Sequence, residues 1–79
     1  MKVQVLYFAS LRDAAGCACE VVDTDARDAA ALYAQLRARH GFTWEPGSLR
    51  AALDGAFVAW DAPLREGAEV AFIPPVSGG

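Results

Sequence analysis

The sequence has one lysine, one histidine, two cysteines and no long apolar run. Lys2 is the only lysine among 7 basic residues, which face 10 acidic ones, so the formal net charge is -3. Without a basic stripe to neutralise phosphates, binding to nucleic acid or to anionic membrane surfaces is disfavoured. The apolar stretches are far shorter than the ~18 residues of a membrane span, and the polar turn after the first residues is unlike a signal peptide. We therefore expect a cytoplasmic protein with no nucleic-acid or membrane partner.

The residue types that usually carry catalysis or bind metals are few and poorly placed. Cys17 and Cys19 are separated only by Ala18, too close for a relaxed disulfide, and two thiolates do not complete a four-ligand metal site. His40 precedes Gly41, which is typical of a cation that complements the end of a helix. The 10 carboxylates are scattered over turns and a helix start, as on a solvated surface. We expect reduced thiols, no bound metal or cofactor, and no catalytic side chain.

The first third of the chain predicts two paired strands. Val3, Val5 and Tyr7 alternate with other side chains, a pattern of period two that is typical of a strand with one buried face. Residues 11–16 are interpreted as a short turn closed by Gly16, and residues 19–22 as a second strand. The two strands are expected to form a hairpin.

An alanine-rich helix is predicted over residues 29–39, between clear start and stop signals. Asp28 is the expected N-cap, with Thr24 as the alternative if the helix begins earlier, and Gly41 is expected to end the helix. A loop over residues 42–48 follows.

The remainder of the chain predicts three more strands. Asp54 and Gly55 form a strong hairpin signal because both positions tolerate positive φ, and Pro74 stops the last strand because proline cannot donate to a ladder. The three strands are expected at 49–53, 57–60 and 68–73. The resulting order, ββαβββ with one main helix, is that of an α+β protein with the β-grasp architecture: a mixed sheet of four to five strands with the last strand beside the first. At 79 residues we expect a single domain, over 1–75, followed by a flexible tail over 76–79.

Strand alternation also predicts an apolar surface. If Val3, Val5 and Tyr7 face the helix, the side chains between and after them face away from it. A single helix cannot cover both faces of a sheet, so an apolar outer face suggests a partner. Coverage of these side chains by loops remains the alternative at this point. The expected patch, at the root of the tail, consists of Leu6, Phe8, Phe57 and Ile73.

The last residues contain nothing able to join a sheet. A stiff Pro74-Pro75 spacer is followed by Val76, Ser77, Gly78 and Gly79. Glycines lack Cβ, so such an end can thread a narrow channel in another protein, but a frayed terminus without function is also common. The residues alone leave both interpretations open.

Three segments together carry a family resemblance. The run from Phe72 to Gly79, Phe-Ile-Pro-Pro-Val-Ser-Gly-Gly, resembles the ending of the molybdopterin synthase sulfur carrier family. Residues 5–13 are similar to that family's first strand and following turn, and residues 61–70 to its approach to the last strand. Gly-Gly alone is shared with ubiquitin-like proteins and thiamine sulfur carriers, whereas the full ending at this length is more specific. Residues 41–48 and the two cysteines match no family motif.

The resemblance implies a carrier that works through its C-terminus. The carboxylate of Gly79, presented through Gly78, would be adenylated by a ubiquitin-activating-like adenylyltransferase that uses ATP and magnesium, and a sulfurtransferase would supply the sulfur of a thiocarboxylate. The tail would then enter the large subunit of molybdopterin synthase, in a heterotetramer, and donate sulfur to cyclic pyranopterin monophosphate. The residues expected to bind the partner are the outer-face side chains Leu6, Phe8, Phe57 and Ile73, together with the tail residues Pro74, Pro75, Val76 and Ser77.

Three other functions remain open from the sequence. The chain could carry sulfur for thiamine or another metabolite, although thiamine carriers are usually shorter and lack this Phe-Ile-Pro-Pro-Val run. It could be a ubiquitin-like modifier joined through Gly79 to protein lysines. It could also be an interaction module with an inert tail, which deletion of Gly78 and Gly79 would leave functional.

Overall fold

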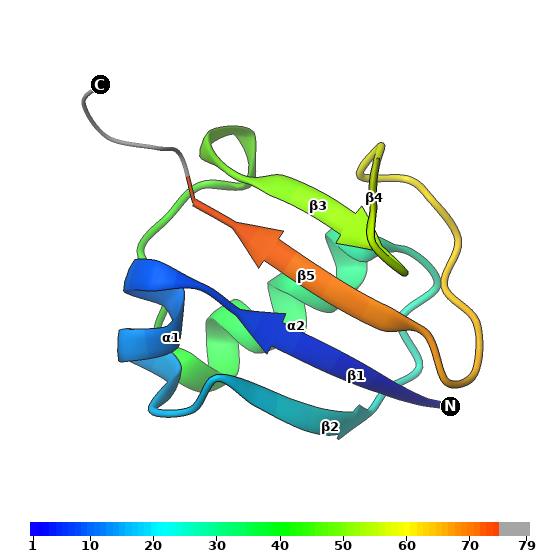
Figure 1. Ribbon diagram of the computed structural model, residues 1–79, viewed down its shortest axis with the longest axis horizontal. Helices are drawn as coiled ribbons and strands as arrows, with labels where there is room; N and C mark the ends of the chain where they lie inside the picture. Colours follow the sequence, from blue (N-terminus) through cyan, green and yellow to red (C-terminus); the bar gives the residue numbers. More distant parts are fainter. Residues whose placement is uncertain (75–79) are drawn as a thin grey trace.

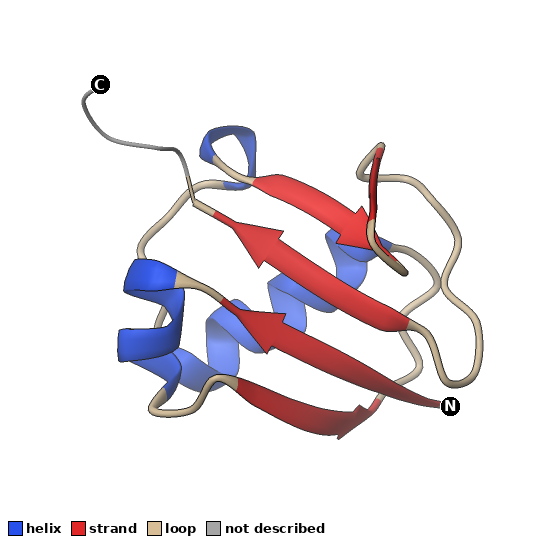
Figure 2. Ribbon diagram, in the orientation of Figure 1, coloured by secondary structure: helices blue, strands red, loops and turns tan. Residues whose placement is uncertain are grey.

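The computed structural model describes residues 1–74, and they form one five-stranded sheet with a helix across one face (Figure 1). The strand order is β2-β1-β5-β3-β4, with β5 parallel to β1 and all other neighbours antiparallel. Figure 2 shows the sheet as one layer and the long helix α2 behind it. This is the β-grasp architecture expected from the order of the elements. The strands are β1 (Lys2–Tyr7), β2 (Cys19–Asp23), β3 (Arg50–Leu53), β4 (Ala56–Val58) and β5 (Glu69–Ile73), and the helices are α1 (Ala9–Ala15), α2 (Ala29–His40) and the 3-10 turn η1 (Pro46–Ser48).

The core lies between the sheet and α2. Val3, Val5 and Tyr7 of β1 are all buried, as their alternation predicts, and Val70 and Phe72 of the neighbouring β5 are fully buried. Because Val5 pairs with Val70 and Tyr7 with Phe72, these side chains share the face that meets the helix. From α2, the buried contributions are Ala29, Leu32, Tyr33 and Leu36.

Helix α2 begins and ends where its flanking residues predict. Asp28 has extended backbone angles, and its Oδ1 accepts a 2.8 Å hydrogen bond from the backbone N–H of Ala31. Gly41 ends the helix with φ 74°, and its N–H donates to the carbonyl of Arg37. Such a cap satisfies backbone groups that a helix leaves free at its ends.

The expected turn over residues 11–16 is wrong, because the segment is the helix α1, Ala9–Ala15. Leu11 is fully buried and anchors this helix to the core, which a flexible turn would not require. Gly16 adopts φ 77° and ends the helix, so the predicted stop is correct. The α1 helix therefore separates β1 from β2, which are nevertheless paired antiparallel as expected.

The second hairpin follows its predicted turn but is shorter than expected. Asp54 and Gly55 have φ 50° and 88°, as a two-residue turn with positive φ requires. Strand β4 ends at Val58, so Trp60 lies outside the strand predicted for it. Its ring still packs inward and stacks on Phe72, with 5.8 Å between centroids.

Candidate functional site

The outer face of the sheet carries an apolar groove of about 260 Å³ on the side opposite α2. Strand β5 runs through it, contributing three side chains two residues apart, and Leu6 of β1 flanks them. Apart from Glu69, every lining residue is apolar. The full lining is Leu6, Phe8, Ala52, Gly55, Phe57, Glu69, Ala71 and Ile73.

Strand register and residue size together create the hollow. Ala71 lies opposite Leu6 on one side and opposite Ala52 on the other, and Ala52 in turn lies opposite Phe57. Directly opposed residues share a face of the sheet, so the small side chains of Ala52 and Ala71 form a floor between larger ones. The result is a depression with an apolar floor and two aromatic walls.

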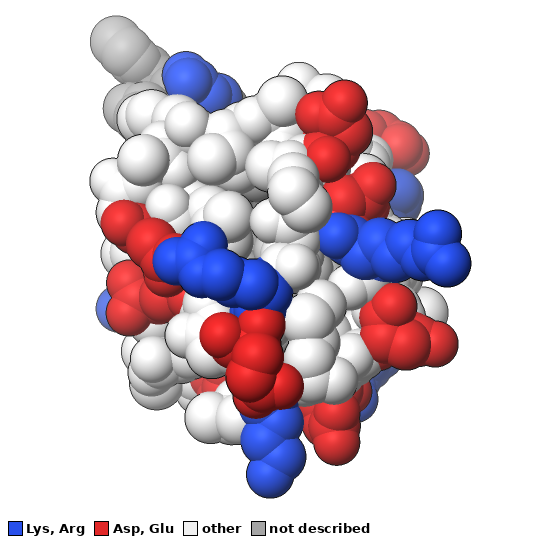
Figure 3. Space-filling view, turned by 90° about the vertical axis from the view of Figure 1, so that its right-hand side faces the viewer, with Lys and Arg blue, Asp and Glu red and all other residues white. Residues whose placement is uncertain are grey.

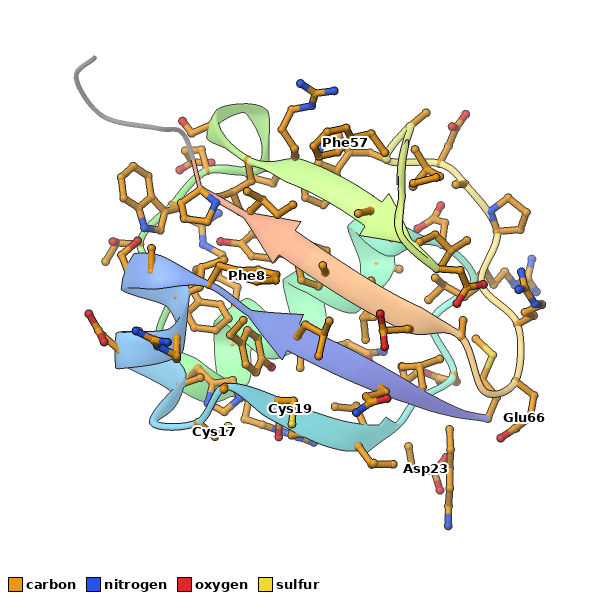
Figure 4. All side chains as sticks on the ribbon, viewed as in Figure 1. Phe8, Cys17, Cys19, Asp23, Phe57 and Glu66 are labelled. Carbon is orange, nitrogen blue, oxygen red and sulfur yellow. The ribbon has the colours of Figure 1, made fainter. Side chains whose placement is uncertain are left out.

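The two aromatic walls are open to solvent. Phe8, which directly follows β1, is 45% exposed, and Phe57 on β4 is 59% exposed. Figure 4 shows the two rings on either side of β5. Apolar surface gathered in this way on a small protein is typical of a docking surface for a partner.

The structure brings together the four side chains that alternation placed on the outer face: Leu6, Phe8, Phe57 and Ile73 all line the groove. Ile73 is the last residue of β5, and Pro74 after it is buried, so the chain leaves the sheet from the end of the groove. The predicted site residues Pro75, Val76, Ser77, Gly78 and Gly79 lie outside the described residues.

A hydrogen-bonded cluster at the other side of the sheet was not anticipated. Glu20 of β2 accepts a hydrogen bond from the Tyr7 hydroxyl, and its Oε2 lies 2.7 Å from Nε2 of His40, the last residue of α2. Arg39 Nη1 lies 3.7 Å from the same carboxylate. His40 therefore ties the end of α2 to β2. Pairing of β1 with β2 and packing of α2 against the sheet place these residues together, so their spacing in the sequence carries no signal of them.

The surroundings of this cluster change the ionisation of two of its members. Burial raises the pKa of Tyr7, and the adjacent carboxylate adds to this effect. Burial alone would also raise the pKa of Glu20, but the hydrogen bonds from Tyr7 and His40 outweigh it and hold that pKa below its ordinary value. The cluster lies away from the groove lining and joins structural elements, so we interpret it as structural.

Charged side chains elsewhere are dispersed over the surface. Figure 3 shows acidic and basic groups interspersed on the face it presents. Arg37 pairs with Glu45 at 3.1 Å and Arg65 pairs with Asp54. Across residues 1–74, no three His, Cys, Asp or Glu side chains are arranged to hold a metal ion, and none of the helices has the length and hydropathy needed to cross a membrane. Cys17 and Cys19 are both free thiols.

Comparison with known proteins gives close matches over the full chain. The ThiS family model matches residues 5–79, a range that includes the Gly-Gly end. The chain is 39% identical to the molybdopterin synthase sulfur carrier subunit of Escherichia coli (strain K12), over 98% of this chain and 99% of that protein. It is 32% identical to the protein of the same name from Haemophilus influenzae, with the same coverage of both chains.

Solved structures agree with the sequence relatives. The putative molybdopterin converting factor subunit 1 from Pyrococcus furiosus superposes with a TM-score of 0.79 at 28% identity, over 96% of this chain and 99% of that one. A complex of subunits 1 and 2 of molybdopterin-converting factor from Helicobacter pylori matches with a TM-score of 0.70 at 26% identity, over 100% of both chains. The small archaeal modifier protein 1 of Haloferax volcanii, at 22% identity and a TM-score of 0.78 over 95% and 98%, shares the fold. The chain belongs to the ThiS family, and within it is a homologue of the molybdopterin synthase sulfur carrier subunit.

Proposed function

We propose that this protein is the sulfur carrier subunit of a molybdopterin synthase and carries its sulfur on the carboxyl group of Gly79. The observation that carries the proposal is the continuity between site and tail: β5 lines an open apolar groove and leads directly into the Pro-Pro-Val-Ser-Gly-Gly end. A docked partner would hold the root of the tail and receive its end. The 39% identity to a sulfur carrier subunit over nearly the whole of both chains supports the same function.

The partner that we assign to the groove is the large subunit of the synthase. Subunits 1 and 2 of the Helicobacter pylori converting factor form a complex, and subunit 1 there is a structural match over the full chain. The groove offers an apolar floor and exposed aromatic walls, which are features of interface cores. Docking there places the tail root against the large subunit, and the family's heterotetramer of two small and two large subunits follows as the expected assembly.

The chemistry takes place on the tail and uses no side chain of the folded domain. A carboxylate is a poor electrophile, so an adenylyltransferase first joins Gly79 to AMP with ATP and magnesium, and pyrophosphate leaves. The persulfide of a sulfurtransferase then displaces AMP to form an acyl disulfide, and a thiol cleaves that disulfide and releases the thiocarboxylate. Within the synthase, the thiocarboxylate sulfur replaces an oxygen substituent on a carbon of cyclic pyranopterin monophosphate, and water cleaves the resulting thioester and returns the Gly79 carboxylate. A dithiolene contains two sulfurs, so two carriers are consumed for each one. We place these steps in the cytoplasm.

The folded domain holds the strand that leads to the tail in a fixed position. Phe72 in the same strand as Ile73 is fully buried against Tyr33 and Trp60, so the strand that leads to the tail is held rigidly. Docking a preorganised surface costs less conformational entropy than docking a mobile one. The domain is therefore a rigid, preorganised surface that presents the tail to the partner from a fixed position.

The intact mass of the protein tests this proposal, after incubation with the activating enzyme, ATP and a sulfur donor. Replacing one oxygen of Gly79 by sulfur adds about 16 Da, and because one oxygen on Met1 or a cysteine adds about the same, fragmentation must locate the change in the tail. A variant without Gly78 and Gly79 is the matched control and should show no gain. Absence of a gain on the tail with a competent activating enzyme would contradict the proposal.

Three further observations separate the alternatives. A loaded tail that donates sulfur to a thiamine precursor, and not to the pyranopterin, would identify a carrier for another metabolite. Lysine-linked conjugates that keep a Gly-Gly remnant would identify a modifier. Full function after deletion of the two glycines would identify a binding module.

A further inference from the structure

Arg50 stands at the rim of the groove, and no carboxylate within residues 1–74 forms an ion pair with it. It is exposed, lies on β3 directly opposite Ile73, and therefore projects from the outer face at the end where the tail begins. Its guanidinium carbon lies 4.2 Å from the centroid of the Phe57 ring. Among residues 1–74, the ion pairs formed by arginines involve Arg37, Arg39 and Arg65, and no carboxylate pairs with Arg50.

Stacking on Phe57 restrains Arg50, while no acceptor in the described part of the chain takes a hydrogen bond from its guanidinium. The aromatic face attracts the cation, whereas the N–H donors of a guanidinium lie in its plane and need oxygen acceptors. A stacked arginine is already restrained, so it loses less conformational freedom when it binds an acceptor. Arg50 is thus a prepositioned donor beside the tail root.

The opposite end of the groove carries the reverse charge. Glu69 begins β5 and lies on the same face as Ile73, four residues away, so the two ends are separated by about 13 Å along the strand. Near Glu69, the Asp54 carboxylate is neutralised by Arg65 and accepts the backbone N–H of Glu69. The groove is therefore polarised, with a cation at the tail end and a carboxylate at the far end, and a partner can match it in one direction only.

We propose that Arg50 is a specificity-determining residue of the docking surface and binds a carboxylate of the large subunit next to the point where the tail enters it. This inference rests on the proposed function. Docking that covers Phe57 also takes water from the guanidinium stacked on it, and a desolvated charge without a partner is strongly unfavourable. The carboxylate thus aligns the large subunit with the tail, and the apolar floor supplies the remaining contact.

Calorimetric titration of the large subunit with variants of the full-length, unmodified carrier tests the proposal. The unmodified carrier has no adenylate phosphate, so a loss of binding reports on a protein acceptor. We expect Arg50→Leu to weaken binding about 10-fold and Arg50→Glu about 100-fold, because a like charge would then face the carboxylate. Arg50→Lys should fall between wild type and leucine, since lysine keeps the charge but not the fork of donors. Arg27→Glu, at an exposed position before α2, changes the net charge equally and should bind as wild type.

Charge reversal on the partner identifies the acceptor. Each Asp or Glu of the large subunit is changed to Lys, and one such variant should restore binding to Arg50→Glu while weakening binding to wild type. If Arg50→Leu and Arg50→Glu both bind within about twofold of wild type, or if no reversal rescues Arg50→Glu, the inference is wrong. Two other variants, Ile73→Asp and the tail deletion, distinguish this failure from failure of the proposed function. If these variants abolish binding and sulfur transfer while the Arg50 variants do not, the role of Arg50 is refuted and the carrier function stands.

Discussion

Replacing Phe8 by alanine should weaken docking of the large subunit strongly while leaving the fold intact. Phe8 is 45% exposed, so of the about 200 Å² that a phenylalanine offers, about 90 Å² remains available to a partner. Burial of that area is worth about 2 kcal/mol, which corresponds to a loss of about 30-fold in affinity. Alanine keeps its Cβ, so this figure is the upper end of the expected effect.

Val21 provides the matched control. It is 69% exposed, more than Phe8, and pairs with Gln4, which places it on the same outer face. It does not line the groove. If docking uses the groove, Val21→Ala should change the affinity by less than about twofold, as contacts outside an interface core do.

Calorimetric titration of the cognate large subunit with both variants measures the difference, and circular dichroism melting checks the fold. Both substitutions are at exposed positions, so the melting temperatures should stay within about 3 °C of wild type. Equal weakening by the two variants would mean that the whole outer face, and not the groove, makes the contact. Wild-type affinity of Phe8→Ala would refute the assignment of the groove altogether.

Three further predictions concern the folded domain. Glu20→Gln should make the free energy of unfolding fall less steeply in acid. The native pKa of Glu20 lies below its ordinary 4.5, so its stabilising contribution is complete above that pH and is lost as the pH falls through the native pKa. If the free energies of unfolding of wild type and variant, from denaturant titrations, change in parallel below pH 4.5, this prediction is wrong. Asp28→Ala removes the cap on Ala31 and should cost about 1 kcal/mol in urea unfolding, with Asp28→Asn as the conservative control that retains most of it. Phe72→Ala empties a fully buried site and should lower the free energy of unfolding by about 3–5 kcal/mol. That is a large part of the total free energy of unfolding of roughly 4–12 kcal/mol expected for a chain of this length. A loss below about 1 kcal/mol would show that the site collapses without leaving a cavity.

Strand alternation predicted the parts of the structure that depend on one face being buried. Val3, Val5 and Tyr7 face the core, so the positions between them face outward whatever the loops do. For this reason Leu6 and Phe8 could be assigned to an apolar patch on the outer face from sequence alone. The cap at Asp28 was equally predictable, since it depends on backbone groups only a few residues away.

The features that the sequence did not predict depend on contacts between residues far apart in the chain. Residues 11–16 include Gly16 and charged side chains that suit a turn, and only the burial of Leu11 in the core shows why Ala9–Ala15 is helical. The Glu20 cluster joins residues from three elements, and the hollow of the groove depends on Ala52 and Ala71 meeting across strands. Strand register sets the hollow of the groove, and the packing of α2 against β1 and β2 completes the cluster. Neither is visible in local spacing.

The two faces of the sheet perform separate tasks, which makes stability and docking independently adjustable. The inner face holds Phe72 against Tyr33 and Trp60, while the outer face exposes Phe8 and Phe57. Substitutions that share no contacts have nearly additive effects, so weakening the Glu20 cluster in acid should lower stability without altering groove affinity until the domain unfolds. A carrier must dock and leave in each cycle, and a rigid core beneath an open groove permits this because no part of the core has to rearrange. Coupling between Glu20→Gln and Phe8→Ala in large-subunit affinity, measured as a double-mutant cycle at neutral pH, would contradict this separation.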